Sequence, residues 1–434
     1  MMETRYTKTT PKGWNLKTVE QVFDFYPTAS YSRDKMFKDN NPSAIGYIHY
    51  GDIHTKYNLI LDVPNTEIPY ISEELKKDFE YIKEGDLILS DTSEDYDGVG
   101  KCIEILNVGN NKIISGLHTL MLRPKGNDLI DGFKGYLFSG EYVRNSLLRI
   151  VTGIKVYSIA KAMLAKVNLP IPSIQEQKEI TNILSKVDKA IASVQNSIAA
   201  AERLKKSLMQ NLLTGKMKPD GTFRTSEEFY IDEKFGKVPV GWEVKKLKDI
   251  ASIQRGKFGH RPRNDERYYN GDFPFVQTSD VVESVLYLKS ASQSLNELGA
   301  SVSKRFPQNT IIMTIAANIG YVALTRYEVY FPDSLIGINA NENIVKPTYL
   351  LFQLMGFKNV LDALATESAQ KNINYSNLRS LPILFPTNIE EQLQIAKRII
   401  KTFRVIEKKK SKIDILERLK KSLMQNLLTG KVTL

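Results

Sequence analysis

A basic stretch with interleaved aromatic residues, QRGKFGHRPRNDERYYNGDF, occupies residues 254–273. Arginine suits phosphates and guanine edges because its guanidinium donates two parallel hydrogen bonds. The glycines between the charges let the backbone approach a polyanion closely. The candidate contacts in this stretch are Arg255, Lys257, Arg261 and Arg263. The composition favours binding of a nucleic acid, and the alternative is an exposed loop with scattered charge.

Short polar loops provide further candidates for contacts with DNA. In the first half of the chain they are residues 26–44, the counterpart of the basic stretch, and SDTSEDYDG at 90–98; in the second half they are TIAANIG at 314–320 and SAQKNINYSN at 368–377. Asparagine and glutamine can pair bidentately with adenine. A polar turn without a partner is the alternative for each loop. The candidate residues are Arg33, Lys35, Ser90, Thr92, Ser93, Thr314, Asn318, Gln370, Lys371 and Asn372.

Motifs for catalysis or for cofactor binding are missing from the sequence. DGVGKC at residues 97–102 lacks the first glycine and the Ser/Thr of a phosphate-binding loop, and no G-x-G-x-x-G opens a βαβ unit. The chain contains no Pro-Pro pair, which excludes the N/D-P-P-Y/F signature of amino-methyltransferases. No H-E-x-x-H motif or cysteine pair suggests a metal, and of the four histidines only His49 and His54 are close in sequence. We therefore expect no catalytic residue, metal site or cofactor in this chain.

The segments that must position the loops are repeated along the chain. Internal repeats are informative because they define the architecture. Weaker matches join Asp52 with Asp280 and EGDLILS with PQNTIIMT. The stronger matched pairs are ERLKKSLMQNLLTGK at 202–216 and 417–431, LPIPSIQEQKEI at 169–180 with LPILFPTNIEEQLQI at 381–395, and PKGWNLKTVEQV at 11–22 with PVGWEVKKLKDI at 239–250. The chain is thus predicted to be two half-molecules that share a scaffold and differ in what they recognise.

Each half is predicted to end in a long helix. Apolar residues recur at steps of three and four from Ile180, which is close to a coiled-coil seam. The same register holds from Ile395, where Thr402 and Lys409 interrupt it. Gly215 and Gly430 stand where helices end. Antiparallel pairing within the chain is favoured because the second globular region starts after one helix and ends before the other. A parallel pair or pairing between molecules is the alternative. The proposed seam joins Leu184, Ile191 and Ile198 with Ile399, Ile406 and Ile413.

Charge and composition restrict the class of protein. Of the formal net charge of +11, segments 173–216 and 388–434 contribute +3 and +7, whereas the first 172 residues sum to −1. Such a basic excess attracts polyanions, and a solvated lysine-rich helix surface is the alternative. The single cysteine and the lack of a signal peptide or a long apolar segment predict a cytoplasmic, globular protein.

The predicted fold is mixed α/β (α+β), with two globular regions separated by two long helices that pair as an antiparallel coiled coil with pseudo-two-fold symmetry. The expected domains are residues 1–172, the first spacer helix at 173–216, residues 217–387 with an N-terminal linker at 217–238, and the second spacer helix at 388–434. Expected strands include IGYIHY, GDLILS and FPFVQTSDV.

This layout resembles the specificity (S) subunit of type I restriction–modification systems over the whole chain. The resemblance depends on the P-x-G-W openings, on YIHYGDI and FPFVQTSDV, on the LPIP and LPILFP segments that lead into IQEQ and IEEQ, and on the long helices that close on LLTGK. Each motif is weak alone, but all of them occur in order and twice. The net charge of −1 in the first region departs from expectation, so its grip on phosphates must be local or supplied by partners.

The resemblance implies a non-catalytic subunit in which each globular domain reads one half of a bipartite double-stranded DNA target. The helices would be a spacer and a docking surface for two methyltransferase (M) subunits, with Leu208, Leu212, Leu423 and Leu427 among the contacts. S-adenosylmethionine, ATP and Mg²⁺ would belong to the M subunits and to restriction (R) subunits. The alternatives are a stand-alone nuclease or methyltransferase of unrecognised type and a coiled-coil scaffold protein.

Overall fold

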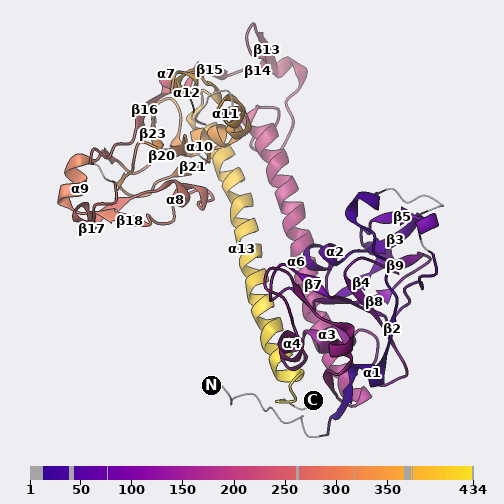
Figure 1. Cartoon of the computed structure of the whole chain (residues 1–434). Helices are drawn as coiled ribbons and strands as arrows, with labels where there is room; N and C mark the ends of the chain where they lie inside the picture. Colours follow the sequence, from indigo (N-terminus) through magenta and orange to yellow (C-terminus); the bar gives the residue numbers. More distant parts are fainter. Residues whose placement is uncertain are drawn as a thin grey trace. The chain divides into compact units, whose positions relative to one another are not determined.

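The computed structural model describes residues 13–432 apart from 39–43, 76, 261–262, 317, 366–372 and 374. The fold is mixed α/β, as predicted, and the chain divides into two compact units (Figure 1). Unit 1 comprises residues 1–195 and 411–434, and unit 2 comprises residues 196–410. Within the described residues, no helix is long and apolar enough to span a membrane.

Two larger sheets form most of the sheet structure in the described residues of unit 1. The larger contains, in spatial order, β2 (Phe23–Tyr26), β10 (Thr119–Pro124), β6 (Leu87–Ser90), β8 (Cys102–Asn107) and β4 (Ile60–Asp62). Its neighbours are antiparallel except that β4 runs parallel to β8. In the smaller sheet, β3 (Ala44–Ile48) lies antiparallel to β5 (Tyr70–Ser72) and parallel to β9 (Ile113–Ser115). The helices of this unit are α1 (Val19–Val22), α2 (Tyr50–Thr55), α3 (Lys134–Ser139), α4 (Glu141–Arg149) and α5 (Lys161–Ala165), and a short ladder joins β7 (Thr92–Ser93) to β11 (Tyr157–Ser158).

The two larger sheets among the described residues of unit 2 have four strands each. The first, fully antiparallel, has the order β16 (Ala251–Arg255), β23 (Leu335–Ala340), β20 (Ile311–Thr314) and β21 (Val322–Leu324). In the second, β17 (Tyr269–Phe275) lies antiparallel to β18 (Gln293–Leu295) and parallel to β22 (Val329–Tyr330), which pairs with β19 (Arg305–Phe306). The helices are α7 (Leu247–Ile250), α8 (Thr278–Val282), α9 (Glu297–Val302), α10 (Pro347–Gly356), α11 (Lys358–Ala365) and α12 (Tyr375–Arg379), and β13 (Phe229–Asp232) forms a hairpin with β14 (Gly236–Pro239).

The two units repeat one topology. The order β2-β10-β6-β8 in unit 1 matches β16-β23-β20-β21 in unit 2, and β5-β3-β9 matches β18-β17-β22. Strands β6 and β20 lie at the ends of the predicted matching segments EGDLILS and PQNTIIMT, and each alternates its apolar residues between two cores. A strand buried on both faces reads as a continuous apolar run, which explains why this match survived in the sequence.

The expected strands IGYIHY and FPFVQTSDV are each only partly extended. The chain leaves β3 after Ile48 and β17 after Phe275, and a short helix follows, α2 in one unit and α8 in the other. In unit 2 the Asp280 carboxylate accepts the Gln277 N–H at 2.8 Å and thereby caps the helix start. This local hydrogen bond favours helix over continued strand.

The repeated sequence motifs meet at one place in each unit. In unit 1, β1 (Asn15–Thr18) pairs antiparallel with β12 (Asn168–Ile171), and in unit 2 β15 (Trp242–Lys246) pairs antiparallel with β24 (Pro382–Pro386). The indole N–H of Trp14 donates to Glu176 at 3.1 Å, and that of Trp242 donates to Glu391 at 3.2 Å. The P-x-G-W and Glu-Gln motifs therefore recur together because their side chains bond to each other.

A buried glutamine fixes the start of each long helix. Gln177 donates to the carbonyls of Pro172 (3.0 Å) and Asp128 (2.8 Å), and its oxygen accepts the Ile130 N–H (3.0 Å). The second copy makes the same set of bonds, from Gln392 to Pro386 and Ile344 and from the Lys346 N–H to Gln392. Both side chains are fully buried. Each clamp joins the helix to the globular part of its own unit.

The long helices are α6 (Ile174–Leu213) and α13 (Ile389–Leu427). In each unit the beginning of one helix shares a core with the end of the other, which is the predicted antiparallel arrangement. In unit 1, Leu184 of α6 lies in the same cluster as Leu427, and in unit 2, Leu208 lies with Ile399. Gly215 and Gly430 follow the helix ends with φ of +67° and +60°, the left-handed conformation predicted for a C-terminal glycine.

The expected role of four leucines as contacts for partner subunits is wrong for most of them. Leu208, Leu212 and Leu427 are buried in the cores of their own units, and Leu423 is partly buried against the core of unit 1. The core of each unit covers Leu208, Leu212 and Leu427, so these three are not available to another protein. The exposed apolar residue of the repeat is the leucine at Leu204 and Leu419, exposed to 54% and 46%.

Candidate nucleic-acid interface

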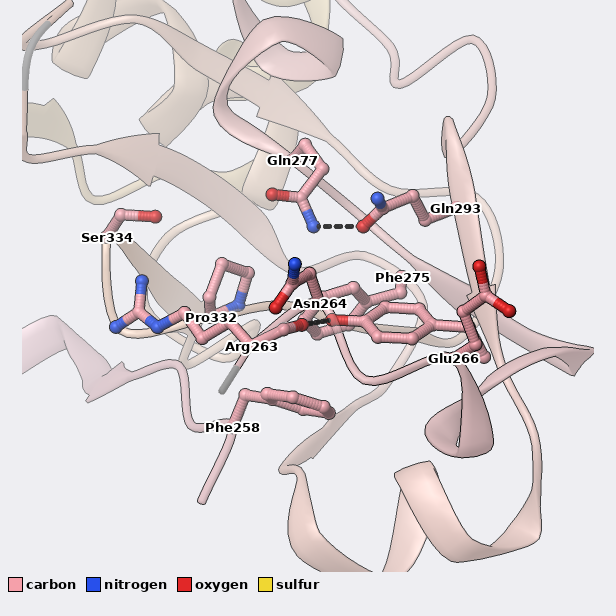
Figure 2. A pocket seen from close by; sticks show the side chains of 10 residues that line it. Phe258, Arg263, Asn264, Glu266, Phe275, Gln277, Gln293, Pro332 and Ser334 are labelled. Carbon is pink, nitrogen blue, oxygen red and sulfur yellow. Dashed lines mark hydrogen bonds between the residues drawn. The ribbon is translucent and has the colours of Figure 1, made fainter. Parts of the chain in front are cut away.

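A pocket of about 390 Å³ in unit 2 brings together polar and aromatic side chains from separate strands and loops (Figure 2). The loop between β16 and β17 contributes Arg263, Asn264 and Glu266, and the segment before β23 contributes Pro332 and Ser334. Phe258, Tyr269 and Phe275 form its aromatic wall, in which the Phe258 ring centroid lies 5.7 Å from that of Tyr269 and 5.3 Å from that of Phe275. The basic, aromatic stretch of the sequence thus lines a cavity.

Two carboxamides complete the pocket. Gln277 precedes α8 and Gln293 begins β18, and the Gln277 side-chain N–H donates to the Gln293 side-chain oxygen at 2.8 Å (Figure 2). Asp280 holds both segments. Its carboxylate accepts the Gln277 backbone N–H at 2.8 Å, and it accepts the Ser292 backbone N–H and hydroxyl at 3.0 Å each. The amide pair is therefore fixed by the backbone on both sides.

Several arginines of the basic stretch already have partners within unit 2. Arg263 pairs with the Asp333 carboxylate at 2.5 Å, and the Arg255 guanidinium donates to the Asp333 carbonyl at 2.6 Å. Arg267 pairs with Asp265 at 2.7 Å, and the Arg267 hydrogen bonds lower the pKa of that carboxyl. Lys257, also predicted as a contact, has an exposed side chain. Arg261 lies outside the described residues.

Three histidines surround Tyr50 in unit 1. The Tyr50 ring centroid lies 4.6 Å from that of His49, 6.0 Å from that of His54 and 5.2 Å from that of His118. The His49 Nδ1 accepts the Gly51 N–H at 3.1 Å, so the neutral ring carries its proton on Nε2. Burial lowers the pKa of His49 to about 4, and the nearby Arg33 acts in the same direction. His49 is therefore neutral at pH 7.

Several predicted contacts lie beside this histidine cluster. The Ser90 hydroxyl is 3.0 Å from His54 Nε2 and donates to the Thr92 carbonyl at 2.7 Å. The Thr92 hydroxyl donates to Asp91 at 2.7 Å and lies 3.2 Å from His118 Nδ1. His118 has φ of +53°, which is uncommon for a residue with a side chain. Predicted residues and histidines far apart in the sequence thus form one polar cluster.

The remaining predicted residues have different surroundings. Ser90 and Thr314 end the equivalent strands β6 and β20, are fully buried, and use their hydroxyls within the following turn, where Thr314 donates to the Asn318 carbonyl. Ser93 is buried and accepts the Asp95 N–H at 3.1 Å, whereas Asn318 is exposed. Arg33 pairs with the buried Asp52 at 3.1 Å, and Lys35, 3.7 Å from Asp34, is exposed. Gln370, Lys371 and Asn372 lie outside the described residues.

The family model described as "Type I restriction modification DNA specificity domain" matches residues 11–203 and 239–418 of the chain. The chain belongs to this family. The two matched segments cover both halves of the repeat, and together they span most of the chain. The protein is a type I specificity subunit, the non-catalytic component that serves DNA target recognition in a restriction–modification system.

Named relatives agree with this family over nearly the full length. The chain is 24% identical over 431 residues to a putative type I restriction enzyme MjaX specificity subunit of Methanocaldococcus jannaschii, with 97% of this chain and 94% of the relative covered. It is 20% identical to the EcoKI specificity subunit of Escherichia coli K12, with 91% and 82% covered.

Solved structures show the same fold. The S subunit of a type I restriction–modification system from M. genitalium superposes with a TM-score of 0.56 at 12% identity and covers 98% of each chain. A chain from a structural study of complex assembly and conformational transition in the type I system also gives 0.56, at 15% identity, with 98% of this chain and 100% of that chain covered. The antiparallel long helices and the two α/β regions of this specificity subunit are therefore those of known S subunits.

Sequence reasoning missed the central residues of both clusters in this specificity subunit. None of Tyr50, His118, Gln277 and Gln293 is a lysine or an arginine, so a search for basic charge does not find them. His118 is also distant in sequence from Tyr50, and Gln293 lies sixteen positions from Gln277. One signal was present. His49 and Gln277 are 228 positions apart, the same offset as Asp52 and Asp280, and each immediately precedes the short helix that follows the central strand.

Proposed function

We propose that this specificity subunit reads a bipartite double-stranded DNA target, with each unit reading one half. The observation that carries the proposal is the repeated topology with unlike chemistry at the same point. The residues before α2 and α8 are His49 and Gln277, and the residues before β10 and β23 are His118 and Ser334. A shared scaffold that carries two imidazoles at these points in one copy, and a carboxamide and a hydroxyl in the other, suits recognition of two different sequences.

We assign the reading regions to residues 1–172 and 217–387, and the spacer helices to 173–216 and 388–434. The DNA contacts proposed from the sequence remain candidates within this scheme. Lys257 and Lys35 have exposed side chains suited to phosphates, whereas Ser90 and Thr314 would act by holding their loops. Because residues 1–172 have a net charge of −1, the affinity of the first region for DNA would depend more on base contacts and on partner subunits.

The same scheme assigns the catalytic chemistry to other subunits. Two methyltransferase subunits would dock on the spacer helices and bring S-adenosylmethionine to an adenine, and restriction subunits would bring ATP and Mg²⁺. The exposed Leu204, Leu419 and Ile415 are apolar side chains on α6 and α13 that a partner would cover. The net charge of these helical segments would in addition attract the DNA that lies between the two half-sites.

Mapping of methylated adenines tests this function. The chain is produced with its methyltransferase partners, and methylated sites are mapped on genomic DNA from a host that lacks the system. We expect one split motif that disappears without this chain. Exchange of residues 239–387 for the second region of another S subunit should change one half of the motif and leave the other half intact. A change in both halves, or a continuous motif, would contradict the proposal.

A further inference from the structure

We infer that the Gln277–Gln293 carboxamide pair of unit 2 is a specificity-determining element that recognises the N6/N7 edge of an adenine in the second half-site. This inference rests on the proposed function and adds to it the base and the residues. The adenine is one that the methyltransferase does not modify, because a base that is removed from the duplex for methylation no longer offers this edge in the groove.

The chemistry of the pair matches one base edge. A primary amide has two N–H donors and an oxygen with two lone pairs. One Gln277 N–H is used for Gln293, so a second N–H and acceptor capacity remain on the same amide. In the major groove, adenine offers a donor at N6 beside an acceptor at N7, whereas guanine offers two acceptors. The Gln277 oxygen would face the guanine O6 without a proton between them, which disfavours guanine.

Positioning of the amides distinguishes this pair from an ordinary exposed glutamine. Gln277 is half-buried, its amide is held by Gln293, and its backbone is held by Asp280. Asp280 also holds Ser292, the residue before Gln293, so one carboxylate aligns both chain segments. Such preorganisation reduces the entropy that a long side chain loses when it binds. Asp280 is a positioning residue in this arrangement.

The surroundings fit a base edge better than a phosphate. The two glutamines lie on one side of the pocket and Phe258 on the other (Figure 2). The rings of Phe258, Tyr269 and Phe275 provide an apolar wall that keeps water from competing for the amides. Glu266 on the rim disfavours a phosphate at this point, and the Arg263 charge is paired with Asp333.

The position of Gln277 in the repeated topology gives independent support. Its equivalent in unit 1 is His49, which lies in the cluster with Tyr50, His54 and His118. The residue before β10 is His118 and the residue before β23 is Ser334, which also lines the pocket. The same two points of the scaffold therefore present polar groups in both units, with a different chemistry in each.

The test uses the complex of the chain with its methyltransferase partners and a library of randomised DNA duplexes, from which bound duplexes are selected and sequenced. Gln277→Glu keeps the shape but removes the N–H donors, and Gln293→Met removes the partner amide. We expect each variant to reduce the preference for adenine at one position of the second half-site by about tenfold to a hundredfold. The first half-site should be unchanged, as it should be with the control Gln394→Met, an exposed glutamine of α13.

The outcomes separate this inference from the proposed function. A wild-type complex that selects no split motif would overturn the proposed function, and the inference with it. A wild-type split motif whose second half is unchanged in both variants would overturn the inference alone. A variant that loses the preference at both half-sites has lost its fold. The inference is then tested with the wild-type complex on chemically modified DNA. Replacement of each second-half adenine in turn by 7-deazaadenine should weaken binding at one unmethylated position, and equal binding at all of them would overturn the inference.

Discussion

At the residue scale, His49 connects the polar cluster of unit 1 to the stability of the fold. Burial lowers its pKa to about 4, with a contribution from Arg33, whereas Asp52 acts in the opposite direction. In the unfolded chain a histidine titrates near 6.5. Below that pH the unfolded state takes up a proton that the folded state does not. The contribution of His49 to stability is therefore complete above about pH 6.5 and is lost as the pH falls towards 4.

We predict that His49→Gln flattens this part of the pH profile. Glutamine is the residue at the equivalent position in unit 2; it does not titrate, and its side-chain oxygen can accept the hydrogen bond of the Gly51 N–H. Between pH 6.5 and 4.5 the wild-type chain should lose about 2 kcal/mol of unfolding free energy that the variant does not lose. Urea unfolding at a series of pH values measures the difference. Parallel curves for the two proteins would show that His49 is protonated equally in both states.

Lys257 is the clearest test of phosphate contact at the basic stretch. Its N–H donates to the Phe331 carbonyl at 3.0 Å, and its carbonyl accepts the Ser303 hydroxyl at 2.7 Å, so the backbone keeps its path when the side chain is removed. Arg255 and Arg263 are less suitable, because either change would also release Asp333.

In the complex with methyltransferase, Lys257→Ala should weaken binding to all DNA sequences alike and reduce the salt-dependence slope by about one unit. A titration of DNA affinity against salt concentration measures both quantities. Lys245→Ala, on the scaffold strand β15, is the control that should leave the slope unchanged. Loss of discrimination at a single base position would instead indicate that Lys257 contacts a base edge.

At the element scale, the buried glutamine clamps explain why the IQEQ and IEEQ motifs are repeated. Gln177→Leu would leave the Pro172 and Asp128 carbonyls and the Ile130 N–H without their partner. Buried polar groups without hydrogen bonds are costly, and we predict a loss of about 3 kcal/mol of unfolding free energy. Gln175→Leu, two residues earlier and exposed, should cost less than about 0.5 kcal/mol. Equal losses for the two variants in denaturant unfolding would mean that the clamp is not a stabilising contact.

The elements of the fold were more predictable from the sequence than the candidate site. The second copy repeats the hydrogen bonds that Trp14, Glu176 and Gln177 make in the first. The spacing of these residues therefore recurs in the sequence and can be recognised. Strands β6 and β20 were recognisable as apolar runs. The long helices were recognisable from the period of their apolar residues and from the glycines that follow them.

The site could not be predicted in the same way, because its residues meet only in three dimensions. Asp280 brings Gln277 and Gln293 together. His118, which precedes β10, lies beside Tyr50 of α2. Basic charge indicates Arg255 and Arg263 as contacts. The sequence does not reveal that Arg263 pairs with the Asp333 carboxylate and that Arg255 donates to the Asp333 carbonyl. Strand-end hydroxyls selected Ser90 and Thr314, whose burial depends on the packing of the whole sheet.

At the scale of the whole molecule, each copy of the fifteen-residue repeat contains both buried and exposed leucines. Its buried leucines, Leu212 and Leu427, lie in the core of a different unit in each copy. Its exposed leucine, Leu204 in one copy and Leu419 in the other, is not needed for either core. A sequence that is identical at exposed as well as buried positions suits a protein that presents the same surface twice, to two copies of one partner.

We predict that Leu204→Ser and Leu419→Ser each weaken the docking of one methyltransferase subunit and that the double variant weakens both. Exposed leucines contribute little to folding, so the unfolding free energy should change by less than about 0.5 kcal/mol. Native mass spectrometry during titration with the methyltransferase subunit would count the subunits bound to each variant. Leu298→Ser, an equally exposed leucine on α9, is the control that should bind two. The two positions are equivalent, so the double variant should lose both methyltransferase subunits. A double variant that loses only one subunit, or full binding by every variant, would contradict a twofold docking surface on the repeat.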